Sequence, residues 1–144
     1  MKFTINSLNR RSFSGLLALG LFVGLTAGIT GDPALAGTVK YSAKKFEKIK
    51  KSGKPVMLDF YAPWCGTCRT QSRVIKALRA NNKAYEKITF MTVDWDTNKS
   101  KPIARGLKIP RRSTLVMFKG GREVGRVVAG TSSKVIKKLL NRGL

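Results

Sequence analysis

The two cysteines of this 144-residue chain lie three positions apart, where a strand-like pattern gives way to a helical one. A cysteine in the first turn of a helix faces unpaired N–H groups and the positive end of the helix dipole, so its thiolate is favoured. One helical turn brings the second sulfur within disulfide reach of the first. The spacing of Cys65 and Cys68 therefore predicts a dithiol that can open and close.

Metal binding and a purely structural disulfide are the alternatives for this pair of cysteines. A structural zinc ion takes four ligands, whereas the chain has only two cysteines and no histidine. The lack of histidine also argues against attachment of a c-type haem. A disulfide that closes so short a loop removes little chain entropy and stabilises a fold poorly. We therefore favour a redox-active pair and expect no metal or organic cofactor.

The segment Trp64-Cys65-Gly66-Thr67-Cys68 resembles the active-site segment of the thioredoxin superfamily. The resemblance covers nearly all of residues 38–142 and implies an α/β thioredoxin fold, with a central mixed β-sheet flanked by helices. It also implies a protein-disulfide oxidoreductase, in which Cys65 attacks and Cys68 resolves the mixed disulfide. Trp64, Gly66 and Thr67 are then candidate substrate-binding residues, and the motif leaves the direction of the reaction open.

Hydrophobic periodicity predicts an element order that agrees with this fold. A buried strand is expected before the cysteines, a hairpin near the C-terminus and an amphipathic helix at each end, while residues 94–98 have the composition of a turn. The last helix is expected to bury Val135, Ile136, Leu139 and Leu140. The predicted helices span residues 42–51, 65–81, 101–105 and 132–141, and the predicted strands span residues 55–61, 88–93, 115–118 and 124–128.

Asp59 is the only charged residue in the predicted strand 55–61. Burying an unpaired carboxylate is costly, so burial would raise its pKa toward the range useful for proton transfer. By resemblance, Asp59 matches the buried acid that relays the proton of the second cysteine in thioredoxins. Thr92 stands where those proteins usually have a lysine, so Asp59 is expected to lack a stabilising cation. The alternative is a strand-end aspartate that reaches solvent.

The largest departure from the thioredoxin pattern precedes the hairpin. Thioredoxins place a cis-proline immediately before a strand that begins with threonine, and this proline faces the cysteines. Here Thr114 begins that strand, Ser113 precedes it, and Pro110 lies three positions earlier. Either Ser113 replaces the proline, which we slightly favour, or residues 111–113 are an insertion after Pro110. Ser113, Thr114 and Pro110 are all candidate substrate-binding residues.

The first 36 residues have the composition of an export signal. They combine a basic start, an uncharged apolar run over residues 15–29 and a small-x-small cleavage pattern at Ala34-Leu35-Ala36. Residues 9–13 resemble a twin-arginine signal, with an ordinary secretory signal and an uncleaved membrane anchor as alternatives. We expect a cleavable signal peptide over 1–36 and a periplasmic thioredoxin-like domain over 37–144.

The chain is strongly basic, with a formal net charge of +22. Loss of three basic residues and one acidic residue with the leader leaves a net charge of +20. Such a charge favours an acidic client, an acidic electron donor or anionic lipid, although it also serves solubility alone. Basic residues are not interleaved with aromatic ones, so we expect no nucleic-acid binding.

Two classes of function remain open. The first is a monomeric oxidoreductase that acts on protein thiols and disulfides, recycled by a membrane-bound electron donor or acceptor. The second is a non-catalytic binding module, which docks an acidic partner while its disulfide stays closed. If Arg111 and Arg112 lie near the cysteines, they would stabilise the Cys65 thiolate and shift the reduction potential toward an oxidant. The alternative for this pair is a solvated loop.

Overall fold

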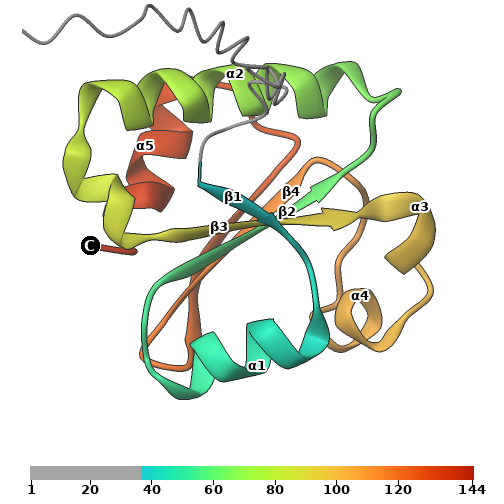
Figure 1. The fold of residues 1–144 in the computed structure, drawn as a ribbon. Helices are drawn as coiled ribbons and strands as arrows, with labels where there is room; N and C mark the ends of the chain where they lie inside the picture. Colours follow the sequence, from blue (N-terminus) through green and yellow to red (C-terminus); the bar gives the residue numbers. More distant parts are fainter. Residues whose placement is uncertain (1–36) are drawn as a thin grey trace, which may run out of the picture. The chain divides into compact units, whose positions relative to one another are not determined.

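The computed structural model describes residues 37–144, which form a five-stranded mixed β-sheet with helices on both faces (Figure 1). The strand order is β1-β3-β2-β4-β5; β2 runs parallel to β3 and antiparallel to β4. This architecture confirms the predicted thioredoxin fold, whereas the expected signal peptide lies outside the described residues. The strands are β1 (Thr38–Lys40), β2 (Val56–Tyr61), β3 (Thr89–Asp94), β4 (Thr114–Lys119) and β5 (Arg122–Val128).

Helices cover both faces of the sheet. In Figure 1, α2 and α5 lie on one face, and α1 lies on the other. Helix α1 begins after Ser42, whose hydroxyl accepts a hydrogen bond from the N–H of Lys45 as an N-cap. None of the helices among the described residues is long and apolar enough to cross a membrane. The helical elements are α1 (Ala43–Lys51), α2 (Gly66–Asn81), the 3₁₀-helix η1 (Lys83–Lys87), α3 (Trp95–Asn98), α4 (Pro102–Gly106) and α5 (Ser133–Asn141).

Strand β2 is buried on both faces, as its continuous apolar run predicted. Val56, Leu58 and Phe60 belong to the core beneath α1 and α4. Met57 belongs to the opposite core, which is formed with α2 and α5. Because side chains alternate along a strand, Asp59 projects on the same side as Met57, toward α2.

Three local expectations differ from the structure. Residues 95–98 form the short helix α3 and not only a turn, because the carboxylate of Asp94 caps the N–H of Thr97. Strand β1 and the 3₁₀-helix η1 were not predicted; both are shorter than the windows in which periodicity is informative. Val135 is 45% exposed, so the buried stripe of α5 consists of Ile136, Leu139 and Leu140.

Replacing Ile136 with alanine should destabilise the fold by about 2–5 kcal/mol, because this side chain is fully buried between α5 and the sheet. Its neighbour Val135 provides a matched control, since Val135→Ala removes a side chain that is 45% exposed. Chemical denaturation of both variants measures the difference. Similar losses for the two variants would contradict this packing of α5.

Candidate active site

Both cysteines lie at the start of helix α2. Cys65 is the N-cap of the helix, and its Sγ accepts a hydrogen bond from the N–H of Cys68 at 3.2 Å. Both thiols are free in this structure. Cys68 is fully buried, and Cys65 is only 4% exposed. The attacking group of any exchange reaction therefore exposes little of its surface to solvent.

Ser113 lies against both sulfurs. Its Oγ is 3.1 Å from the Sγ of Cys65 and 3.1 Å from the Sγ of Cys68, and its side chain is fully buried. Pro110 is exposed on the loop before it. Thr114 is buried at the start of β4, where its hydroxyl donates to the carbonyl of Arg111. Of the two residues weighed for the cis-proline position, Ser113 is the one that contacts the cysteines.

The backbone of Ser113 follows a path that proline cannot adopt. Its φ is 61°, in the left-handed region that few non-glycine residues occupy. Its N–H donates to the carbonyl of Phe60 at 2.8 Å, and its carbonyl accepts from the N–H of Ala129 at 2.8 Å. Proline has a φ near −65° and no N–H, so this loop is not a cis-proline loop with the ring removed.

Gln71 ties helix α2 to the same loop and was not singled out from the sequence. Its Nε2 donates to the carbonyls of Ser113 at 3.1 Å and Gly130 at 2.9 Å, and its side chain is fully buried. The available signal was positional, because Gln71 shares the inward face of α2 with Cys68 and Ile75 at helical spacing. A polar side chain on an apolar stripe indicates a buried hydrogen-bonding role.

An aromatic side chain and a guanidinium group stand beside Cys65. Trp64 is 55% exposed, and its indole N–H donates to the carboxylate of Asp96 at 2.8 Å. The guanidinium carbon of Arg112 lies 4.3 Å from the centroid of the Trp64 ring, which is a cation–π contact. Arg111, in contrast, is exposed on the loop. Only the second arginine of the pair thus has a contact that holds it near the thiols.

The two thiols differ in acidity. Burial raises the pKa of Cys65, but hydrogen bonds from Cys68, Ser113 and Arg112 outweigh this effect and lower the pKa to about 7. The pKa of Cys68 is raised, first by burial and then by the hydrogen bond that its thiol makes to Cys65. Near neutral pH the pair can therefore hold one thiolate, on Cys65, and one thiol, on Cys68.

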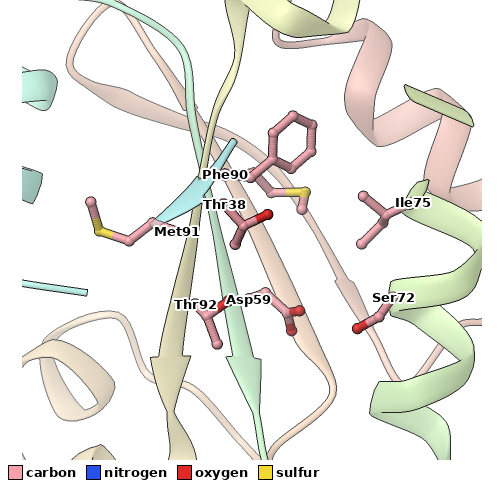
Figure 2. A pocket seen from close by; sticks show the side chains of 8 residues that line it. Thr38, Asp59, Ser72, Ile75, Phe90, Met91 and Thr92 are labelled. Carbon is pink, nitrogen blue, oxygen red and sulfur yellow. The ribbon is translucent and has the colours of Figure 1, made fainter. Parts of the chain in front are cut away.

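Asp59 is a buried acid on the strand that leads to the cysteines. Burial, followed by the negative charge of Cys65, raises the pKa of Asp59 to about 7. Its Oδ1 has no hydrogen-bond partner among the described residues. It borders a cavity of about 10 Å³, close to the room that one water needs. In Figure 2 the carboxyl group lies between Thr92 of β3 and Ser72 of α2, and the hydroxyl of Ser72 turns toward it.

Comparison with known proteins identifies the family. The thioredoxin family model matches residues 37–142. Thioredoxin H-type from Fagopyrum esculentum is 33% identical over 71% of this chain and 84% of its own length. Thioredoxin from Mycobacterium tuberculosis is 32% identical over 76% of this chain and 92% of its own length. The chain belongs to the thioredoxin family.

A solved structure agrees with this assignment. The crystal structure of Trxlp from Edwardsiella tarda superposes with a TM-score of 0.65 at 32% identity, covering 72% of this chain and 98% of the other. The resemblance stated from the Trp64–Cys68 segment is therefore confirmed at the level of family and fold. Thioredoxins act on protein disulfides, so a general disulfide oxidoreductase activity follows for this member.

The remaining predicted site residues lie at the rim of the thioredoxin dithiol. Gly66 is exposed and Thr67 is half-buried in the first turn of α2.

Over the described residues, there is no cluster of three or more histidine, cysteine, aspartate or glutamate side chains able to hold a metal ion. Members of the thioredoxin family use the dithiol itself and normally need no cofactor.

Replacing Asp59 with asparagine should stabilise the reduced protein in a pH-dependent way. The unfolded chain loses the Asp59 proton near pH 4, whereas the folded chain holds it to about pH 7, so the wild-type stability falls across that window. The difference in free energy of unfolding between Asp59→Asn and the wild type should therefore grow from pH 4 to pH 7 and level off above pH 7, where the variant is more stable by roughly 2–4 kcal/mol. Chemical denaturation at several pH values tests this.

Asp94→Asn provides a control of opposite sign for the Asp59 experiment. Hydrogen bonds from Thr97 lower the pKa of Asp94, so the native carboxylate adds stability above its unfolded pKa and loses it as the pH falls. Replacing Asp94 should cost stability at neutral pH and little in acid. An Asp59→Asn advantage that is the same at pH 4 and pH 8 would contradict a raised pKa for Asp59.

Introducing the proline of other thioredoxins at position 113 should destabilise this chain by about 3 kcal/mol or more. Ser113→Pro removes the N–H that donates to the carbonyl of Phe60, and a proline cannot adopt a φ of 61°. Ser132 provides a matched control, since its φ of −64° suits a proline ring. The free energies of unfolding of Ser113→Pro and Ser132→Pro make the comparison. A Ser113→Pro variant as stable as the Ser132→Pro variant would contradict the described loop conformation.

Proposed function

We propose that this chain is a thiol-disulfide oxidoreductase of the cell envelope that exchanges disulfides with protein substrates through Cys65 and Cys68. The observation that carries the proposal is the placement of the two thiols at the start of α2, where the Cys65 Sγ accepts from the N–H of Cys68 at 3.2 Å and the Ser113 Oγ lies 3.1 Å from each sulfur. In this setting the pKa of Cys65 is lowered to about 7 and that of Cys68 is raised. Such a pair supplies a nucleophile at neutral pH and keeps the second sulfur protonated until it is needed.

In the proposed reaction the Cys65 thiolate attacks a client disulfide, and the client releases its first sulfur as a thiolate. Cys68 then loses its proton and attacks the Sγ of Cys65, which frees the second client thiol and closes the Cys65–Cys68 disulfide. Asp59 is the proposed proton acceptor for Cys68, because its pKa of about 7 allows it to take up and release a proton near neutral pH. Two electrons pass from the dithiol to the client.

The acidity of Cys65 favours the reductant direction. Thioredoxin has a nucleophilic cysteine with a pKa of about 7, whereas the strong oxidant DsbA has one of about 3.5. Arg112 lowers the pKa of Cys65 as the sequence suggested, but burial opposes it and the value stays near 7. We propose that a membrane-bound donor re-reduces the pair. The composition of residues 1–36 supports export to the periplasm.

Client proteins would approach the dithiol across its exposed rim. Trp64 offers an exposed aromatic surface beside Cys65, and Gly66 and Thr67 lie in the first turn of α2. Arg112 adds a positive charge over the Trp64 ring. Together with the basic chain, this rim supports clients or donors with acidic surfaces near their reacting sulfurs.

Replacing the two cysteines separately should give two different defects. Cys65→Ser should lower the rate of reduction of a disulfide-bonded protein such as insulin by more than about a hundredfold, because it removes the nucleophile. Cys68→Ser should retain the first attack and accumulate a mixed disulfide through Cys65, visible by non-reducing gel electrophoresis. If both variants reduced the disulfide-bonded protein as fast as the wild type, a role for the dithiol would be contradicted.

The reduction potential of the pair separates catalysis from docking. A value near about −270 mV supports a reductant, and one near −120 to −180 mV supports an oxidant or isomerase. A pair that stays oxidised well below about −300 mV behaves as a structural disulfide. That outcome would favour a non-catalytic basic module that docks an acidic partner, and a Cys65→Ser variant would then keep its partner.

A further inference from the structure

Among residues 37–144, the Ser113 hydroxyl is the one side-chain oxygen with a hydrogen-bond contact to both reacting sulfurs. It lies 3.1 Å from each Sγ and is fully buried. A proline at this position would offer the sulfurs no polar hydrogen. Compared with the proline of other thioredoxins, Ser113 therefore adds a hydroxyl group to the site in addition to changing the backbone.

The surrounding fold holds this hydroxyl in place through its own backbone. The N–H of Ser113 donates to Phe60 on β2, and the carbonyl accepts from Ala129 and from Gln71 on α2. These three hydrogen bonds keep Ser113 at a φ of 61°, a conformation that costs energy for any residue with a side chain. A donor fixed before the reaction need not reorganise during it, which makes its interaction with a developing charge more effective.

A hydroxyl has one hydrogen and two lone pairs, so it donates to one sulfur at a time while it accepts from the other. With Cys65 ionised, the Ser113 hydroxyl donates to the Cys65 thiolate, and the one proton of the Cys68 thiol serves the hydrogen bond to Cys65 or to the Ser113 Oγ. We propose that Ser113 is a catalytic residue whose hydroxyl donates first to the Cys65 thiolate and then, once Cys65 is in the mixed disulfide, to the Cys68 sulfur as it loses its proton. This inference rests on the proposed function.

The two donations belong to two balanced steps. In the first, the Cys65 thiolate forms a bond to one client sulfur, the client S–S bond breaks, and the departing client thiolate takes a proton from water. Cys65 is then uncharged, so the Ser113 hydroxyl is free to turn to Cys68. In the second, the Cys68 proton passes to Asp59, the new thiolate bonds to the Cys65 Sγ, and the second client sulfur leaves with the electron pair. The Ser113 proton is retained throughout.

Ser113→Gly and Ser113→Ala test the proposal as a pair, because both remove the hydroxyl but act oppositely on the backbone. Glycine accepts a φ of 61° without strain, whereas alanine does not. In the reduced full chain, ultraviolet absorbance of the thiolate reports ionisation of Cys65 as a function of pH. At pH values below the wild-type pKa of Cys65, the fraction of Cys65 present as thiolate should be about tenfold lower in both variants, as expected for the loss of one hydrogen bond to a charged group. Ser132→Ala, which removes an exposed hydroxyl, should titrate as wild type.

The second donation is tested with Cys68 as the only thiol. In a Cys65→Ala background, Ser113→Gly should shift ionisation of Cys68 to higher pH. Client reduction by the single variants should fall most below the wild-type pKa of Cys65 and recover as the pH rises, because alkaline pH restores the thiolate. A purely structural role for Ser113 would lower activity without moving either titration.

The outcomes separate this inference from the proposed function. Folded Ser113→Gly and Ser113→Ala proteins with wild-type titrations would overturn the role of the hydroxyl, even if the wild type reduces clients. If the titration shifted in Ser113→Ala but not in Ser113→Gly, the effect would come from backbone strain, and the role of the hydroxyl would also be overturned. If the wild type reduces no disulfide but both titrations shift as stated, the proposed function fails while the hydrogen bonds stand.

Discussion

The set of hydrogen bonds that holds Ser113 joins three parts of the fold at one residue. Phe60 on β2 accepts its N–H, Gln71 on α2 donates to its carbonyl, and Ala129 just after β5 donates to the same carbonyl. These bonds fix the loop before β4 against the start of α2, where Cys65 begins the helix. The spacing of the hydroxyl and the two sulfurs follows from this backbone geometry, so the chemistry of the site depends on it.

Burial and hydrogen bonding act in opposite directions on the acidity of the site. Burial raises the pKa of Asp59 and of both cysteines, because each charged form loses its hydration. Only Cys65 gathers enough hydrogen-bond donors to reverse the effect, and its negative charge in turn raises the pKa of Asp59. Two groups with pKa values near 7 thus share a buried region, which suits proton exchange at neutral pH.

Much of the fold was predictable because its signals are local. The apolar run of β2, the Gly-Gly hairpin between β4 and β5 and the stripe of α2 all gave the correct element. Errors arose where a few residues decide the structure, as in β1, η1 and the helical turn after Asp94. Val135 was predicted to be buried but is 45% exposed, because helical spacing alone does not show where the buried face of a helix ends.

The sequence by itself determined the family and the dithiol at a helix start, because both are encoded by residue types at short fixed spacing. It also singled out Asp59 as a candidate buried acid, and the structure decided its burial. Tertiary structure alone decided that Ser113 contacts both sulfurs, that Gln71 holds its carbonyl and that Arg112 stacks on Trp64. These contacts join residues more than 40 positions apart, and their geometry depends on strand register and a left-handed φ at Ser113. No local pattern specifies such distances, since they exist only after the sheet and helices have packed.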